Sequence, residues 1–217
     1  MVPLLDKLFQ KNRFVIMTGG SGLYIDAVCE GIDDMPDIDP HTRESVKSYY
    51  QKEGLGGLRR WLQSIDPVYY AQVDIANPKR MMRGIEVFLS SGTKFSDFRI
   101  KDKVERPFGI KKIILSRQRH DLCDRINQRT DAMIQQGLIE EAKALYPLKH
   151  LNALNTVGYK ELFAYFENTS TLDEAIEKIK TNTRRYAKRQ MTWFRRYTYA
   201  KYFDPNELEL IVKHIIS

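Results

Sequence analysis

The sequence predicts an α/β protein in which a parallel-sheet core carries a separate helical segment. The apolar run at residues 14–17 lacks the polar–apolar alternation of half-exposed strands, which is typical of a buried parallel strand, and the β-branched run at residues 110–116 returns the chain to the sheet. Between them, an Asp or Asn precedes a proline at positions 39, 66 and 77, and each such pair is a strong helix start. The segment between the two runs is therefore expected to be helical, and helices predominate in the rest of the chain.

The composition is that of a globular protein with a basic surplus. The 217 residues are 42% hydrophobic and 29% charged, with a formal net charge of +7. No apolar run approaches the roughly 18 residues of a membrane helix, and the N-terminus has no signal-peptide pattern. The two isolated cysteines favour a reducing compartment, so we expect a cytoplasmic protein. The positive charge indicates a polyanionic partner.

A glycine-rich turn follows the first predicted strand. Gly19, Gly20 and Gly22 precede apolar residues at helical spacing, and Ser21 adds a hydroxyl. A turn of this kind at the carboxyl end of a strand lets a substrate approach the backbone, and the following helix N-terminus favours an anion. The same pattern also occurs where the turn only connects a strand to a helix, and it is neither a Walker A sequence nor a dinucleotide fingerprint.

Residues 32–107 are predicted to form a helical insertion. The acidic stretch 32–38 leads out of the core, and helices are expected over 40–53, 57–65, 67–73 and 78–91, with glycines ending the first and the last. The core then comprises residues 1–31 and 108–217. Its second part is predicted to contain helices over 117–136, 138–145, 155–166 and 172–196, a closing strand at 202–204 and a terminal helix at 208–216.

The helix expected over 172–196 carries the clearest electrostatic feature. Residues 178–201 include nine Lys or Arg, Arg184 and Lys188 among them, and no acidic residue. Solvated helix faces usually mix charges, so this run favours an anionic partner such as RNA. The interleaved aromatic residues are able to stack on bases, but those at helical spacing, including Tyr186, are better explained as core.

Two further groups of cations suit phosphates. Residues 79–83 begin a helix with three cations, and Arg125 and Arg129 share one helix face four residues apart, as a diphosphate clamp requires. A solvated helix turn and salt bridges to Asp121 or Asp124 explain these patterns equally well. The four histidines have no metal-ligand spacing, so no metal site is predicted.

Several separated motifs together resemble the tRNA dimethylallyltransferase family. Each motif is weak alone, but their order and spacing match over nearly the whole chain. The matching stretches are 18–24 (Thr-Gly-Gly-Ser-Gly-Leu-Tyr), 38–40 with Arg43, 77–80 with 83–87, 125–129, 137–141, 157–161, and 183–190 with 192–194.

The resemblance implies a P-loop-type core whose helical insertion closes on a tRNA anticodon stem-loop. The implied reaction transfers a dimethylallyl group from dimethylallyl diphosphate, with Mg²⁺, to N6 of the adenosine 3′ of the anticodon. The implied partners are therefore tRNA and the diphosphate, and we expect a monomer.

Carried over by position, the resemblance places Ser21 near the reacting amine, where the family usually has Thr. It implies diphosphate contacts at Gly19, Gly20, Arg125 and Arg129. It implies tRNA contacts at Arg43, at Lys79, Arg80, Met81, Met82 and Arg83, and at Asn155, Thr156, Val157, Gly158, Tyr159 and Lys160.

One departure from the family concerns the phosphate loop. In the family this loop and a catalytic aspartate precede the glycine turn by tens of residues, whereas no G-x-x-x-x-G-K-[ST] sequence occurs here. We therefore expect a family member without that N-terminal segment, its general base lying outside the chain and the chain alone being inactive. The alternatives are a non-catalytic basic RNA-binding module and a nucleoside-kinase fragment, although a kinase does not explain the motif set.

Overall fold

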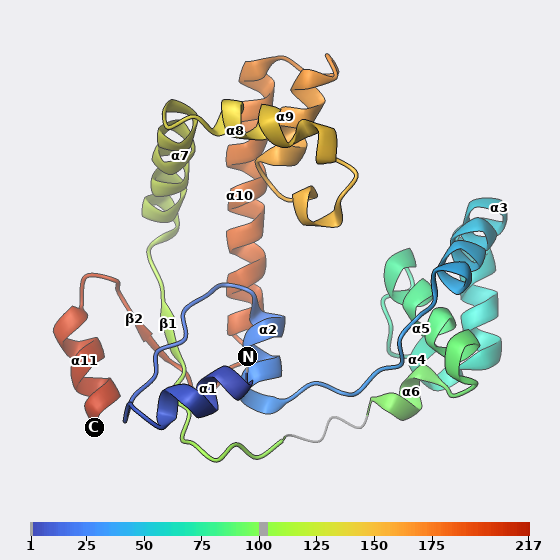
Figure 1. The fold of residues 1–217 in the computed structure, drawn as a ribbon, viewed down its shortest axis with the longest axis horizontal. Helices are drawn as coiled ribbons and strands as arrows, with labels where there is room; N and C mark the ends of the chain where they lie inside the picture. The colour runs from blue at the N-terminus through green and yellow to red at the C-terminus, as the bar shows by residue number, and fades with distance from the viewer. Residues whose placement is uncertain (1, 100–103) are drawn as a thin grey trace. The chain divides into compact units, whose positions relative to one another are not determined.

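The computed structural model describes residues 2–99 and 104–217, and its regular structure is mostly helical (Figure 1). The described residues fall into two compact units. The first comprises residues 2–16, 23–99 and 104–108, and the second comprises residues 17–22 and 109–217. None of the described helices is long and apolar enough to cross a membrane.

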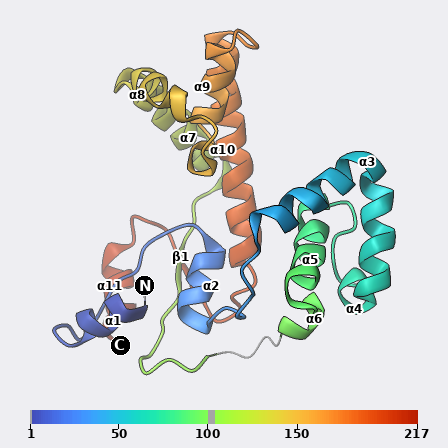
Figure 2. The ribbon, with the colours of Figure 1, turned by 45° about the vertical axis from the view of Figure 1, so that its right-hand side comes forward.

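Helices alone form the regular structure of the described residues up to position 99. The longest, α3, consists of two arms joined at Gly54, whose φ of +64° is a left-handed conformation that glycine adopts without strain (Figure 2). The sequence prediction of two helices separated at this glycine is therefore confirmed. The helices are α1 (Val2–Phe9), α2 (Gly22–Glu30), α3 (Pro40–Ile65), α4 (Pro67–Tyr70), α5 (Pro78–Ser91) and α6 (Phe95–Phe98).

The three predicted helix starts are confirmed. The side chains of Asp39, Asp66 and Asn77 each accept a hydrogen bond from the backbone N–H three residues later, at 2.8, 2.9 and 3.3 Å. A proline follows each of them in the first helical position, where no N–H is needed. Gly92, at φ +70°, ends α5 as predicted.

A small apolar core holds α3, α4 and α5 together. Asp66 is fully buried beside it, and its second carboxylate oxygen accepts a 2.8 Å hydrogen bond from the N–H of Ser96 in α6. The carboxylate thus starts one helix and anchors another. The buried core residues are Val46, Leu58, Leu62, Tyr69, Met81 and Ile85.

Residues 104–108 lie with α1 and α2 in the first unit, while the domain boundary expected after residue 31 stays a prediction. Arg106 donates hydrogen bonds to the carbonyl oxygens of Val28 and Ala27 at 2.8 and 3.1 Å, and Phe108 stacks on Phe9. These contacts connect α1 and α2 to residues 104–108. The predicted boundaries also include residues 1 and 100–103, which lie outside the described residues.

The second unit contains a two-stranded parallel sheet and a helical bundle. In the sheet, Ile114 lies opposite Tyr202, and the flanking residues pair in the same register. The elements are β1 (Ile113–Leu115), α7 (Arg119–Gln135), α8 (Leu138–Leu145), η1 (Tyr146–Leu148), η2 (Asn152–Leu154), α9 (Tyr159–Phe166), α10 (Leu172–Phe194), β2 (Lys201–Phe203) and α11 (Leu208–Ile216).

The long helix α10 runs beside α7 and α9 (Figure 1), and the second core lies between α8, α9 and α10. Thr171 and Glu174 form the predicted capping box at its start, with hydrogen bonds of 3.2 and 3.0 Å. Lys180 adds an ion pair to Asp131 of α7 at 2.8 Å. The buried core residues are Leu138, Ala142, Leu162, Phe163, Ala175 and Ile179.

The strand predicted at residues 14–17 is wrong. No strand is present there in the described chain, and Ile16 is 73% exposed although it was expected to be buried. A strand requires ladder hydrogen bonds to a neighbour, and the two described strands form theirs with each other. An apolar run alone does not supply such a neighbour.

Candidate active site and RNA-binding surfaces

The carboxyl ends of β1 and β2 border a small pocket, which we call the strand-end pocket. The strands are parallel, so Leu115 and Phe203 end at the same edge of the sheet. This is where open α/β proteins bind their ligands. The pocket has a volume of about 220 Å³ and is lined by Leu115, Ser116, Arg117, Leu122, Arg125, Met191 and Pro205.

The glycine turn, residues 17–22, lies against α10 within the same unit. The side chain of Gln190 donates a hydrogen bond from Nε2 to the carbonyl oxygen of Gly20 at 2.9 Å. The indole of Trp193 packs on Gly22 so closely that a Cβ there would lie 2.1 Å from the ring. These contacts explain why the turn is grouped with the second unit. Ser21, between the two held glycines, is exposed immediately before α2.

The two arginines of α7 are available for a ligand. Arg125 and Arg129 are both exposed, and Arg125 lines the strand-end pocket. Neither forms a salt bridge to Asp121 or Asp124 within the described parts of the chain; Asp121 instead lies 3.0 Å from the imidazole of His120. The ligand-binding interpretation of Arg125 stays a prediction, and the structure adds that this side chain lines the pocket.

A buried carboxylate shapes the turn at residues 155–160. Glu161 is 6% exposed, and its two oxygens accept hydrogen bonds from the N–H of Gly158 at 2.8 Å and from Asn182 of α10 at 2.7 Å. Gly158 has a φ of +107°, which favours glycine, and its N–H is directed at that carboxylate. The helix predicted from Asn155 therefore starts only at Tyr159, since the preceding residues form this turn.

Most side chains of that turn face solvent. The hydroxyl of Tyr159 is the exception: it donates to Glu141 of α8, and this hydrogen bond raises the pKa of the tyrosine. The exposed residues are Asn155, Thr156, Val157 and Lys160.

The basic residues of α10 differ in their surroundings. Lys188 is exposed, whereas Arg184 donates hydrogen bonds to Asn127 of α7 at 2.6 Å and to Thr181 at 2.9 Å. Arg184 thus links α7 to α10. The core assignment of Tyr186 is wrong: its side chain is 41% exposed, with the Arg189 guanidinium 5.8 Å from the ring centre. Tyr186 follows Ile179 by seven residues and so lies near the same helix face, but the buried residues of α10, Ala175 and Ile179, are confined to its first half.

In the first unit, the predicted RNA-contacting residues are only partly accessible. Arg43, Lys79 and Arg80 are exposed, and Met82 and Arg83 are half-buried. Met81 is fully buried in the core, so its side chain does not reach the surface. The spacing that places cations on one face of α5 places this methionine on the other.

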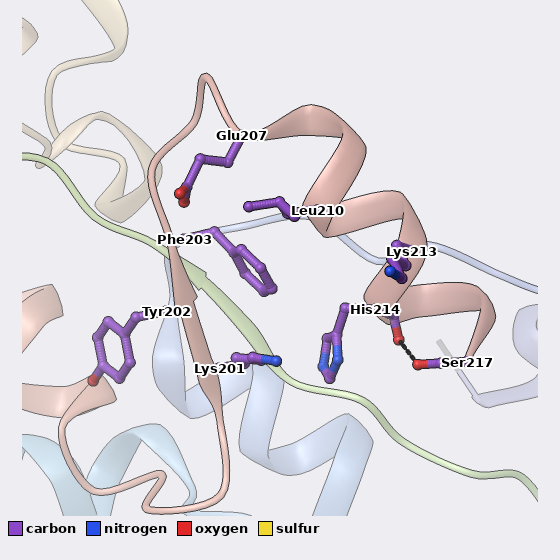
Figure 3. Close-up of a pocket in the computed structure, with 8 residues that line it drawn as sticks. All are labelled: Lys201, Tyr202, Phe203, Glu207, Leu210, Lys213, His214 and Ser217. Carbon is purple, nitrogen blue, oxygen red and sulfur yellow. Dashed lines mark hydrogen bonds between the residues drawn. The ribbon is translucent and has the colours of Figure 1, made fainter.

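A larger pocket lies between β2 and α11 and contains none of the predicted site residues (Figure 3). Its volume is about 400 Å³, and its lining includes the rings of Phe203 and His214, whose centres are 5.7 Å apart. Its lining includes the whole of β2, from Lys201 to Phe203, but no residue of β1. The strand-end pocket is lined by the predicted site residue Arg125, so it is the better candidate for the active site although it is smaller.

Four residues that hold the site were missed as site residues from the sequence: Asn182, Gln190, Trp193 and Glu161. Two signals in the sequence concern them: Glu161, Gln190 and Trp193 lie in stretches that resemble the family, and two amide side chains, Asn182 and Gln190, interrupt the basic run of α10. A magnesium site was not predicted from the residues, and the described residues contain no group of three or more His, Cys, Asp or Glu able to hold a metal ion. No step is therefore assigned to a metal held by this chain.

Comparison with known proteins places this architecture in a defined class of transferases. The model of the family described as IPP transferase matches residues 2–197. A tRNA dimethylallyltransferase 2 of Parabacteroides distasonis is 50% identical over 99% of this chain and 72% of its own length. A tRNA dimethylallyltransferase 2 of Porphyromonas gingivalis is 53% identical over 94% of this chain and 68% of its own length.

Solved structures agree with these matches. The tRNA isopentenylpyrophosphate transferase of Bacillus halodurans is 32% identical, with a TM-score of 0.63 over 99% of this chain and 69% of its own. A eukaryotic dimethylallyltransferase acting on tRNA is 21% identical with a TM-score of 0.74, covering 96% of this chain and 55% of its own, and so supports the fold alone. The chain belongs to the IPP transferase family, whose named members here are prenyltransferases.

Proposed function

We propose that this protein transfers a dimethylallyl group from dimethylallyl diphosphate to N6 of the adenosine 3′ of the anticodon in tRNA. The observation that carries the proposal is the strand-end pocket bordered by Arg125 and α10, the helix that also holds the glycine turn. It occurs in a chain about half identical to proteins named tRNA dimethylallyltransferase. The alternative of a nucleoside kinase has no comparable support.

The reaction is a displacement at an allylic carbon. The carbon–oxygen bond to the diphosphate breaks, a carbon–nitrogen bond to N6 forms, and one amine proton passes to a general base. The leaving diphosphate requires cations and N–H donors, because negative charge accumulates on it in the transition state. In this proposal the diphosphate is bound by Arg125, Arg129 and the backbone of Gly19 and Gly20. Ser21 forms a hydrogen bond with the reacting amine.

The adenine must leave its stack to be reached, and the protein must grip the surrounding loop. We assign this grip to the half-buried Arg83 and to exposed cations and polar groups of both units: Arg43, Lys79, Arg80, Lys160, Lys188 and the turn 155–157. Residues 32–107 would then form the insertion that contacts the anticodon stem. We also propose that the sheet is of the P-loop type and that the protein is a monomer that acts in the cytoplasm. A Mg²⁺ ion would be bound together with the diphosphate.

We further propose that the 217 residues alone transfer little prenyl group. They contain no phosphate-loop sequence, and removal of even one oxyanion donor typically costs about 10²-fold in rate. The chain spans about 70% of the length of its relatives, for example 72% of that from Parabacteroides distasonis. A chimera in which these residues replace the matching part of that relative supplies the remaining length.

The test incubates radiolabelled dimethylallyl diphosphate and tRNA with either the chain or the chimera. Label is expected in tRNA with the chimera and nearly none with the chain alone. Label transferred to tRNA by the chain alone would overturn its inactivity. Binding of tRNA by both proteins without any transfer would instead favour the non-catalytic RNA-binding module.

A further inference from the structure

We propose that Gln190 and Trp193 are positioning residues for prenyl transfer, which hold the glycine turn so that the Ser21 hydroxyl has one fixed direction. The inference rests on the proposed function for its catalytic consequence, but the hold itself is independent of it. Both side chains project from α10 onto residues that flank Ser21 on either side.

The hydrogen bond from Gln190 fixes a peptide plane. The carbonyl of Gly20 and the N–H of Ser21 belong to the same planar peptide unit. A donor 2.9 Å from the Gly20 oxygen therefore sets the orientation of the backbone at which the Ser21 side chain begins. Since a Cβ on Gly20 would lie 1.9 Å from Gln190 Nε2, the glycine is what allows this close approach.

Trp193 fixes the other side of the serine. Its ring fills the space that a side chain on residue 22 would occupy, so Gly22 is held against a flat surface. The ring is itself held, because the Arg196 guanidinium lies 3.9 Å from its centre. Residues 19–22 contain three glycines, and without these contacts so flexible a segment would let Ser21 adopt many orientations.

A positioning role differs from a purely stabilising one. If Gln190 acts through Ser21, its removal slows the chemical step and leaves substrate binding nearly intact. A displacement of about 1 Å at a reacting group costs up to about 10²-fold in rate. If Gln190 only stabilises the fold, its removal changes the denaturation midpoint and acts independently of Ser21.

The first measurement is hydrogen–deuterium exchange of residues 17–24 in the 217-residue chain. Gln190→Leu keeps the side-chain size and removes the donor, and Gln135→Leu, in α7, is the matched control. We expect exchange in this peptide to become about tenfold faster or more in Gln190→Leu and to stay unchanged in the control. An unchanged exchange rate in Gln190→Leu would overturn the claim that Gln190 holds the glycine turn in place.

The second measurement is a double-mutant cycle in the chimera. We expect Gln190→Leu to lower kcat about 10- to 100-fold, with KM for tRNA and diphosphate within about threefold of native. Combined with Ser21→Ala, it should slow the reaction no more than the slower single variant. Rate effects that multiply would show that the glutamine does not act through Ser21, and a raised KM at unchanged kcat would also contradict the role.

The two measurements separate the inference from the proposed function. An inactive native chimera refutes prenyl transfer and the catalytic role together. The exchange result still decides whether Gln190 holds the turn.

Discussion

Ser21 is the residue on which the proposed chemistry depends most directly. We expect Ser21→Ala in the chimera to lower the single-turnover rate about 10²-fold and to change tRNA affinity little, because a hydrogen bond at the reacting amine acts mainly in the transition state. Rapid-quench transfer and filter binding measure the two quantities separately. Ser21→Thr, which keeps the hydroxyl, should stay within a few-fold of native. Weakened binding at an unchanged rate would show that the turn only packs.

The type of a single residue indicates only part of its role in the site. The sequence indicated Arg125 as a ligand residue, and its place in the strand-end pocket supports that proposal. It did not indicate Gln190, whose partner Gly20 is 170 positions away, because pairing at such a separation depends on the tertiary fold. It also treated Arg184 and Lys188 alike, although Arg184 is tied to a neighbouring helix and Lys188 is exposed.

At the scale of elements, the helix starts of the first unit provide a stability test. Asp66→Ala removes a buried cap and the acceptor for Ser96, so we expect it to lower the free energy of unfolding by about 2–4 kcal/mol. Asn77→Ala removes a less buried cap and should cost about 1 kcal/mol. Urea denaturation of the 217-residue chain followed by circular dichroism measures both. Equal decreases would mean that the second hydrogen bond of Asp66 contributes nothing.

We expect the exposed basic residues of α10 to contact the phosphates of tRNA. Lys188→Gln with Arg189→Gln should weaken binding of cognate and non-cognate tRNA alike. The salt dependence of binding should become shallower by up to about one unit for each phosphate that the helix no longer neutralises. Arg184 is left intact because its replacement would also loosen the packing of α10 on α7. Filter binding across a salt series is the measurement.

The control for this surface is Lys143→Gln with Lys213→Gln, which removes equal charge from exposed positions elsewhere. A slope that changes equally in both double variants would show a general charge effect. A slope unchanged in the α10 variant would leave residues 79–83 as the better candidate.

Element boundaries were predictable where local signals set them. The ranges of α5, α8 and α11 follow from a proline start, glycine stops and apolar spacing, all of which act within a few residues. The strand at 14–17 was not predictable in this way, because a strand depends on a neighbour that the local sequence does not specify. The start of α9 was displaced for a related reason: Gly158 is directed toward the buried Glu161, which Asn182 also contacts.

At the scale of the whole molecule, the sequence motifs identified the family more securely than they identified domains. The family model covers residues 2–197, in agreement with the motif set. The boundary predicted near residue 31 stays a prediction, and residues 27–28 are hydrogen-bonded to Arg106, a non-local contact that the local sequence does not indicate. Contacts of this kind decide where compact units divide, whereas composition marks only acidic or proline-containing connections.

The most direct test of the account is to locate the transferred group in tRNA. The chimera is incubated with dimethylallyl diphosphate and either native tRNA or tRNA in which the adenosine 3′ of the anticodon is replaced by guanosine, and the nucleosides are analysed by mass spectrometry after digestion. We predict N6-dimethylallyladenosine from the native tRNA and no prenylated nucleoside from the substituted one. Prenylation of the substituted tRNA, or none of either RNA by a folded chimera, would contradict the account.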